Sequence, residues 1–350
     1  MALAIAFLIG AGVAAAASRP TSDRESPSIV ASTTSTPSTA PTTALVSTIP
    51  PETTAPDTTP PPPVIAAVGD SVCSPSHSQY NDGNGTPRNC RARGVAGLAQ
   101  SLNPAAVLLL GDLQYECGRA DEWGAFDLAW GGFGERLRPA IGNHEYGHEC
   151  GADDADAYFN YFGARAGDFG HGWYSFDLGD WHLIALNSEC SYGGGAVGGC
   201  SAGTEQHTWL RNDLASHPAQ CTLAYWHEPR FSSGQHGNAE QMTVIWNDLA
   251  RAGVDVVLTG HEHAYERFDP IGVSFASPAF DPTGIRQFVV GTGGKNFDTF
   301  PGPALAGEVV RNDDTYGVLG MTLRPGGYDW QFLPLEGGGG FTDSGSGDCH

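Results

Sequence analysis

Five short polar motifs, each directly after an apolar run, constrain the fold of this chain more than any other feature. The runs are short and rich in aliphatic residues, which is typical of buried strands. In chain order the motifs are Gly69-Asp70, Gly111-Asp112-Leu113-Gln114-Tyr115, Gly142-Asn143-His144-Glu145, Tyr225-Trp226-His227 and Gly260-His261-Glu262-His263. Because strand-like runs alternate with helix-like segments, the sequence predicts an α/β layered domain whose strand ends present one site.

The expected secondary structure follows this alternation. We expect strands at residues 64–68, 105–110, 139–141, 173–176, 181–186, 222–226, 254–258, 287–290, 318–323 and 328–333. The pattern predicts helices at residues 92–102, 121–137, 155–162, 204–215 and 239–252. The glycine-rich stretch at 337–347 is typical of a flexible segment.

The chain divides into four parts. Residues 1–17 are apolar and end in small residues, which predicts a signal peptide, with a short uncleaved anchor as the alternative. Residues 18–63 are rich in Ser, Thr and Pro and predict a disordered linker, either a spacer at the cell envelope or a passive tail. A folded domain at 64–335 precedes a glycine-rich tail at 336–350 that carries Cys349.

Charge and cysteine content restrict the partners and the compartment. The formal net charge is -22 with only 17 Lys plus Arg, which argues against binding to nucleic-acid polymers or anionic membranes. An even number of cysteines, 8, indicates a secreted protein with disulfides. Spacing alone leaves the pairing open. We expect near neighbours to pair, Cys73 with Cys90, Cys117 with Cys150 and Cys190 with Cys200, which leaves Cys221 for Cys349.

Each motif alone has a simpler explanation. A Gly-Asp pair after a strand is usually a turn or a helix cap. Asn143 alone suits a turn, Tyr115 a buried ring, and His227 a packed core position. The joint occurrence of the motifs at successive strand ends instead indicates a metal site.

Together the motifs resemble those of the calcineurin-like metallophosphoesterases. The tyrosine of Gly111-Asp112-Leu113-Gln114-Tyr115 and the run Gly260-His261-Glu262-His263-Ala264-Tyr265-Glu266-Arg267 are similar to the purple acid phosphatase branch. The resemblance covers roughly residues 64–335 and implies that this is the catalytic domain. It also implies two mixed β-sheets packed face to face with flanking helices, and a dimetal site at the C-terminal ends of the strands.

The resemblance implies two metal ions with a shared ligand. One set is Asp70, Asp112, Tyr115 and His263, and the other is Asp112, Asn143, His227 and His261. A carboxylate can bridge two cations and offset their repulsion, so Asp112 is the expected bridge. A phenol binds well only as phenolate, so Tyr115 favours Fe(III) in the first set. Nitrogen and carboxamide ligands in the second set suit a divalent ion such as Zn, Mn or Fe(II).

The expected reaction is hydrolysis of a phosphomonoester by direct attack of metal-bound hydroxide. In the resembling family the histidine that matches His144 contacts the phosphate or protonates the leaving group, and Glu145 would orient it. His236 lies in a Gly- and Ser-rich loop where further substrate histidines occur, although a solvated loop residue is an equally simple interpretation. We therefore expect an acid phosphatase-like hydrolase acting on a small phosphate ester.

Two other functions stay open. Asp70 is followed by Ser71-Val72-Cys73, without the histidine ligand of the cyclic-nucleotide branch, yet a phosphodiesterase or nucleotidase acting on small nucleotides is compatible with the motifs. A non-catalytic, stalked surface binding module is the other alternative. The complete ligand set together with His144 argues against it, because metals that only support a fold do not require that histidine.

Overall fold

The computed structural model describes residues 60–147, 150–152, 154–190, 198–337 and 339–350. The predictions for residues 1–17, and for nearly all of residues 18–63, lie outside these ranges. In the described part of the chain, no helix is both long enough and apolar enough to cross a membrane.

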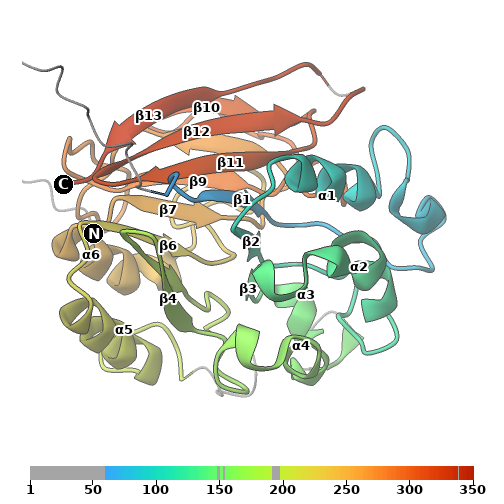
Figure 1. Ribbon diagram of the computed structural model, residues 1–350, viewed down its shortest axis with the longest axis horizontal. Coiled ribbons are helices and arrows are strands. Elements are labelled where there is room, and N and C mark those ends of the chain that lie inside the picture. The colour runs from blue at the N-terminus through green and yellow to red at the C-terminus, as the bar shows by residue number, and fades with distance from the viewer. Residues whose placement is uncertain (1–59, 148–149, 153, 191–197, 338) are drawn as a thin grey trace, which may run out of the picture. The chain divides into compact units, whose positions relative to one another are not determined.

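A six-stranded mixed sheet forms one layer of the domain (Figure 1). Its order is β13-β12-β11-β1-β2-β3. The strands are β1 (Val64–Val68), β2 (Ala106–Leu110), β3 (Leu137–Ala140), β11 (Gly317–Arg324), β12 (Gly327–Pro334) and β13 (Ser344–Asp348). Strands β1, β2 and β3 run parallel, whereas β11, β12 and β13 extend the sheet in antiparallel fashion.

A seven-stranded sheet of order β10-β8-β9-β7-β6-β5-β4 forms the other layer. Its strands are β4 (Tyr174–Leu178), β5 (Trp181–Ala185), β6 (Cys221–Tyr225), β7 (Val256–Thr259), β8 (Tyr265–Phe268), β9 (Arg286–Val290) and β10 (Glu308–Asn312). The central strands β5, β6, β7 and β9 are parallel, and the predicted β4–β5 hairpin is antiparallel.

The two sheets face each other across an inner apolar core. In β1, Ile65 and Ala67 point into this core, whereas Ala66 and Val68 belong to the outer core that the helices cover. Because the central strands are buried on both faces, their sequences are continuous apolar runs rather than alternating ones. The fold-class prediction, two mixed sheets packed face to face with flanking helices, is confirmed.

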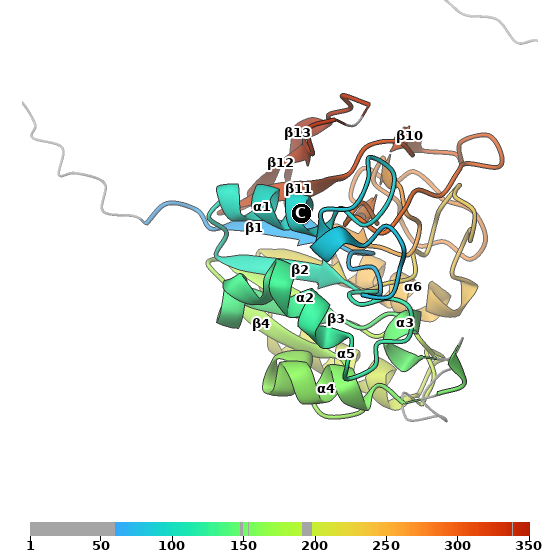
Figure 2. The same ribbon diagram turned by 90° about the vertical axis from the view of Figure 1, so that its right-hand side faces the viewer.

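Helices cover both outer faces of this sandwich. Figures 1 and 2 place α1 and α2 beside the first sheet and α5 and α6 beside the second. The helices are α1 (Ala92–Ser101), α2 (Trp123–Trp130), α3 (Asn143–Tyr146), α4 (Asp156–Phe162), α5 (Glu205–Ser216) and α6 (Thr243–Ala252).

Several secondary-structure predictions are wrong. The helix expected at 121–137 ends at Trp130, a 3-10 segment follows, and Leu137 already begins β3. Gly134 interrupts the 3-10 segment, because its φ of 55° and ψ of -125° are not helical. The short strands β8 and β10 lacked a clear apolar run and were not expected.

The C-terminal segment is not the flexible tail that its glycine content predicts. Residues Ser344–Asp348 form β13 and pair with β12. Asp343, just before β13, accepts hydrogen bonds from Tyr265 Oη at 2.8 Å, Arg267 Nε at 2.7 Å and Trp330 Nε1 at 3.1 Å. The sheet therefore extends past the expected boundary at residue 335.

All four expected disulfides are present. The pairs Cys73–Cys90, Cys117–Cys150, Cys190–Cys200 and Cys221–Cys349 have Cα atoms 5.4 to 5.8 Å apart. The predicted pairing, three near-neighbour bridges and the remaining Cys221–Cys349, is confirmed. The Cys221–Cys349 bridge connects the start of β6 to the chain end just beyond β13.

Candidate metal centre

The predicted ligands follow the ends of five parallel strands. Asp70 follows β1, Asp112 follows β2, Asn143 follows β3, His227 follows β6, and His261 follows β7. Parallel strands present their C-terminal ends at one edge of a sheet, so each sheet delivers its ligands to the same edge. The two edges meet, because the ligands of one sheet contact those of the other.

The first group of contacts centres on the hydroxyl of Tyr115. This oxygen lies 3.0 Å from Asp70 Oδ1, 3.0 Å from Asp112 Oδ2 and 2.8 Å from His263 Nε2. His263 Nε2 also lies 3.4 Å from Asp70 Oδ1. Four potential ligand atoms from three loops therefore converge on one point.

The second group centres on His227 Nε2. This atom lies 3.2 Å from Asn143 Oδ1, 3.3 Å from Asp112 Oδ2 and 3.2 Å from His261 Nδ1. Asp112 Oδ2 thus belongs to both groups. We call the two groups together the strand-end cluster: Asp70, Asp112, Tyr115, Asn143, His227, His261 and His263.

Hydrogen bonds behind two histidines set their tautomers. His227 Nδ1 lies 2.8 Å from the Leu110 carbonyl oxygen, which can only accept, so Nδ1 carries the proton and Nε2 keeps a free lone pair. His263 Nδ1 lies 3.1 Å from Asn296 Oδ1 and 3.9 Å from Asp298 Oδ2. Both rings therefore direct Nε2 into the strand-end cluster, as metal-ligating histidines do.

The backbone is strained where three of these side chains begin. Asp70, Asp112 and His261 have φ values of 60°, 49° and 70°. Such left-handed conformations are uncommon for residues other than glycine and often mark functional sites. The left-handed backbone conformation directs each side chain away from the end of its strand and into the cluster.

Glycines before the ligands allow a close approach of the loops. A Cβ atom on Gly142 would lie 2.5 Å from the backbone nitrogen of Asp112 and 2.9 Å from His227 Cδ2. A Cβ atom on Gly260 would lie 2.6 Å from Asp70 Oδ2. These glycines of the sequence motifs are therefore steric requirements of the cluster.

The electrostatics of the strand-end cluster suit cations. Burial raises the pKa of Asp112, but the neighbouring imidazoles, His227 first, hold that pKa well below its usual range. Burial, and then the carboxylates of Asp112 and Asp70, raise the pKa of Tyr115 well above its usual value. A buried phenol beside two carboxylates becomes a phenolate ligand only with a strongly polarising cation, so the donor set fits a dimetal centre.

His144 lies beside this cluster with one ring nitrogen fixed. Its Nδ1 lies 2.6 Å from the Glu116 carbonyl oxygen and must donate to it, while Nε2 lies 3.8 Å from Asp112 Oδ2. The side chain is largely buried, with 12% of its surface exposed. Its Nε2 is therefore held at the edge of the cluster.

Glu145 contacts the loop backbone, and no hydrogen bond to the His144 ring is found among the described contacts. Its carboxylate accepts hydrogen bonds from the backbone N–H groups of Asp112, Leu113, Gln114 and Gly142 at 2.8 to 3.2 Å. Burial raises its pKa to about 8, while the N–H donors of Gly142 and Gln114 oppose that rise. Glu145 therefore connects the loop after β2 to the loop after β3.

His236 stands at the rim of the site. Its ring centroid lies 4.4 Å from that of His261, and its Nδ1 lies 3.3 Å from Glu262 Oε2. The hydrogen bond that the His236 imidazole donates to the Glu262 carboxylate raises the pKa of His236, although burial opposes it. A small hollow of about 60 Å³ is lined by His236 and His261 together with Glu228.

Several supporting residues escaped the sequence reasoning. Glu262 is fully buried and accepts from the backbone nitrogens of His236 and Gly237 at 2.7 and 2.8 Å. Asp298 accepts from the backbone nitrogen of His263 at 3.1 Å. Glu262 lies between the predicted ligands His261 and His263 in the sequence, and this position could have identified it as part of the site. The Asn296–Asp298 loop follows β9 and carries no motif that the sequence alone identifies.

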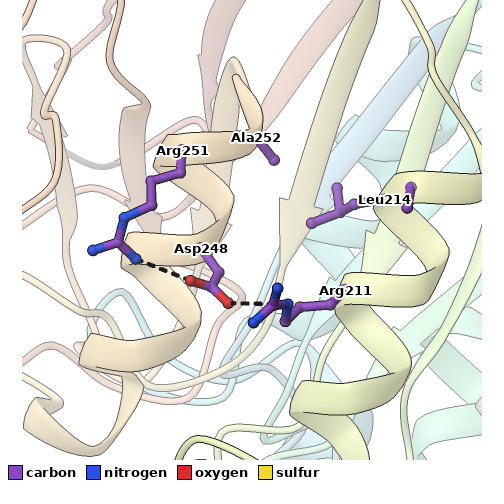
Figure 3. A pocket seen from close by; sticks show the side chains of 6 residues that line it. Arg211, Leu214, Asp248, Arg251 and Ala252 are labelled. Atoms are coloured by element: carbon purple, nitrogen blue, oxygen red, sulfur yellow. Dashed lines mark hydrogen bonds and ion pairs between the residues drawn. The ribbon is translucent and has the colours of Figure 1, made fainter.

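A larger hollow lies away from the strand-end cluster. It has a volume of about 580 Å³ and runs between α5 and α6, lined by Arg211, Leu214, Ala215, Asp248, Arg251 and Ala252 (Figure 3). Asp248 lies 3.0 Å from Arg251 Nη1 and 4.0 Å from Arg211 Nε, so the two guanidinium groups already have a carboxylate partner. None of the predicted site residues lines this groove.

Fold and donor set together define a metallophosphoesterase-type protein. The calcineurin-like phosphoesterase family model matches residues 66–265, more than half of the chain, so this chain belongs to the calcineurin-like phosphoesterase family. The resemblance inferred from the motifs is thereby confirmed.

Several of the curated relatives that match are purple acid phosphatases. Purple acid phosphatase 15 of Arabidopsis thaliana is 31% identical over 180 residues, which cover 47% of this chain and 32% of that protein. Purple acid phosphatase 21 of the same plant is 32% identical over 206 residues, covering 53% of this chain and 43% of that protein. The chain thus spans less than half the length of these relatives.

A solved structure supports the same fold. The purple acid phosphatase PPD1 from yellow lupin seeds superposes with a TM-score of 0.64 at 21% identity, covering 81% of this chain and 53% of that one.

Proposed function

We propose that this protein is a secreted dimetal phosphatase of the purple acid phosphatase type that hydrolyses small phosphomonoesters. The observation that carries the proposal is the convergence of seven predicted ligands into two adjoining groups that share Asp112 Oδ2. Membership of the calcineurin-like phosphoesterase family and the purple acid phosphatase relatives support the reaction class. Four disulfides support secretion.

We assign the two groups to two different ions. Asp70, Asp112, Tyr115 and His263 would hold Fe(III), and Asp112, Asn143, His227 and His261 would hold a divalent ion such as Zn, Mn or Fe(II). Bound there, the ions supply Lewis acidity toward a phosphate ester and a water molecule. The phenol of Tyr115 supports the trivalent assignment, because a phenol binds a metal well only as phenolate, which a strongly polarising ion favours.

The chain's own residues divide the remaining work. His144, fixed through Nδ1, directs Nε2 toward the cluster, where it can bind the phosphate or donate a proton to the leaving oxygen. Glu145 holds the backbone of the β2 and β3 loops and thereby positions Asp112. His236, at the rim beside His261, would be a further histidine that contacts the substrate.

The test combines metal analysis, colour and substrate preference. Protein exported from an oxidising host should contain iron, absorb visible light through phenolate-to-iron charge transfer, and hydrolyse p-nitrophenyl phosphate faster than bis-p-nitrophenyl phosphate. Tyr115→Phe should abolish the visible band, because no other phenol lies among the cluster ligands.

Each outcome separates one part of the proposal. A colourless protein with full activity on zinc or manganese alone would contradict the iron assignment and leave the phosphatase standing. A higher rate on the diester would favour the phosphodiesterase. Absence of turnover of either ester by the metal-loaded protein, with Asn143→Ala changing only stability, would favour a binding module.

A further inference from the structure

The chain has a single lysine, Lys295, and this side chain is buried beside the strand-end cluster. All other members of the 17 Lys plus Arg are arginines. Lysine is almost never buried unless its ammonium group has a partner. The side chain of Lys295 has only 10% of its surface exposed. Two partners account for this burial, the ring of Tyr115 and the carboxylate of Glu116.

The ammonium group lies over the ring of Tyr115, which is a predicted metal ligand. Lys295 Nζ is 4.1 Å from the centroid of that ring. A cation within about 6 Å of an aromatic face is attracted by the negative charge of the π-system, and more strongly where water is excluded. Tyr115 and Lys295 are both buried, so their contact is shielded from solvent.

Glu116 is the second partner of Lys295. Its Oε1 atom forms an ion pair with Lys295 Nζ. The two members differ in exposure, because 46% of the Glu116 side chain is exposed against 10% of the Lys295 side chain. Solvent screens an exposed charge more than a buried one. Of this pair, the positive charge therefore dominates at the Tyr115 ring.

The backbone holds Lys295 in this position. Lys295 follows the run Gly291-Thr292-Gly293-Gly294, which begins directly after β9. The Gly293 nitrogen donates to the Gly69 carbonyl oxygen at 2.9 Å, and the Lys295 nitrogen donates to the Asp70 carbonyl oxygen at 3.2 Å. A Cβ atom on Gly293 would lie 2.2 Å from the Gly69 oxygen, so this approach requires glycine. The loop that carries Lys295 is thereby fixed to the loop that carries Asp70.

We propose that Lys295, by holding a positive charge against the face of the Tyr115 ring, lowers the electron donation of this ligand to its metal ion. The inference rests on the proposed function, because it concerns the ion that Tyr115 would hold. A nearby cation stabilises negative charge on a phenolate ring. With Fe(III) bound, the charge of Lys295 would raise the reduction potential and the energy of phenolate-to-iron charge transfer. Lys295 is thus a positioning residue that acts through Tyr115.

A purely structural role for Lys295 predicts a different result. If Lys295 only neutralised Glu116, its loss would displace the Glu116 backbone and with it His144, whose Nδ1 donates to the Glu116 carbonyl oxygen at 2.6 Å. The rate of hydrolysis would then fall, but the visible band of the iron-loaded protein would keep its wavelength. The visible spectrum therefore distinguishes the two roles, whereas the rate does not.

Visible absorption of the iron-loaded full chain tests the proposal. Lys295→Met keeps most of the side-chain length and removes the charge. Its band should move to longer wavelength by on the order of 20 nm, as estimated for a unit charge about 4 Å from the ring at an effective dielectric constant of about 20. The reduction potential of its iron should fall. Lys295→Arg keeps the charge and should restore most of the wild-type band position.

Two further variants test the sign and the specificity of the effect. Glu116→Gln removes the negative partner, so its band should move to shorter wavelength. This half-exposed position keeps the test valid if variants of the buried Lys295 fail to fold. Arg88→Met is the matched control, because Arg88 Cζ lies over the ring of Phe297, 5.4 Å from its centroid, and Phe297 is not a ligand. Its band should match that of the wild type.

The contact between Lys295 and Tyr115 can be measured without iron. Because the chain has one lysine, isotope-labelled lysine gives one set of NMR signals from the full chain. In the zinc-loaded protein, which is diamagnetic, the ε-methylene protons should lie upfield of their position in free lysine. The reason is that the ring current of Tyr115 shields protons above the ring.

The outcomes separate this inference from the proposed function. A coloured wild type whose band is unmoved in Lys295→Met and Glu116→Gln would overturn the inference and leave the phosphatase standing. Lysine protons without an upfield shift would also overturn it, and so would an equal band shift in Arg88→Met. A colourless wild type would remove the iron assignment and this inference together, while activity with zinc or manganese would still support the phosphatase.

Discussion

The strand-end cluster can be compared with a hydrogen-bonded group on the seven-stranded sheet, Asp177, His182, Asp213 and His217, which we call the His182 cluster. The two combine similar side chains on two very different kinds of backbone. In the strand-end cluster, Asp70, Asp112 and His261 follow strands in left-handed conformations. In the His182 cluster, Asp177, His182 and Asp213 lie within β4, β5 and α5, and neither they nor His217 has a positive φ. One cluster is built from strained loop residues, the other from regular elements.

The difference between the two backbones indicates which parts of a fold can form a site that is open to substrate. Loops at the C-terminal ends of parallel strands can turn several ligands toward a common point and leave one side free for substrate. Each left-handed residue costs about 1–3 kcal/mol, which the surrounding packing must offset. Regular elements hold ligands without that cost, but they leave little freedom of placement. We therefore expect the strand-end cluster to govern activity and the His182 cluster to govern local stability.

The largest expected effect is that of Asp112→Asn. Asp112 belongs to both groups of the strand-end cluster, so the amide should disrupt both metal sites. Metal ions contribute several kcal/mol to catalysis, and each 1.4 kcal/mol corresponds to a tenfold rate. We expect kcat/KM for p-nitrophenyl phosphate to fall by about 1000-fold or more. If activity fell less than tenfold, the shared-ligand assignment would be wrong.

Gly142→Ala should have the next largest effect. Its Cβ would lie 2.5 Å from the Asp112 backbone nitrogen, so the β3 loop must shift by a distance that matters for catalysis. A misplacement of about 1 Å can reduce a rate by about 100-fold, which is the expected loss in kcat. Gly97→Ala is the control, because a Cβ there meets no atom within 4 Å and lies in α1. The control should keep its activity; equal losses in both variants would refute the steric argument.

The smallest effect concerns pH and the His182 cluster. The pKa of His182 is raised in the folded protein, so its stabilising contribution is complete below the unfolded value of about 6.5. That contribution is lost as the pH rises through the folded pKa. With chelator present, urea unfolding from pH 5.5 to 9 should therefore show the wild type losing stability with rising pH relative to His182→Gln. Parallel curves for the two proteins would contradict this assignment.

Much of the fold and of the metal centre could be predicted from local sequence. The buried strands could be predicted from apolar runs, because strands covered on both faces need apolar side chains throughout. Each strand of the site also carried its ligand directly after it, with a glycine before most of them. The glycine, the turn and the ligand are neighbours in the chain, so the motif can be recognised without knowledge of the fold.

Other features depended on contacts between distant segments. The glycine content of the C-terminal segment predicted a flexible tail, yet residues 344–348 form strand β13. Pairing with β12, the Cys221–Cys349 bridge and the contacts of Asp343 hold this strand in place. The sequence predicted that Glu145 orients His144, but the Glu145 carboxylate accepts hydrogen bonds from backbone N–H groups of the loop after β2. Local composition carries no record of such partners.

The sequence by itself determined most of the strands, the ligand types and their order along the chain. Only the tertiary structure decided that Asp112 Oδ2 is common to two groups, that the Leu110 carbonyl sets the His227 tautomer, and that His182 stands between two carboxylates. The physical reason is that hydrogen bonds and metal ligation depend on tenths of an ångström between residues far apart in the chain. Those distances follow from sheet order and register, which no single segment encodes.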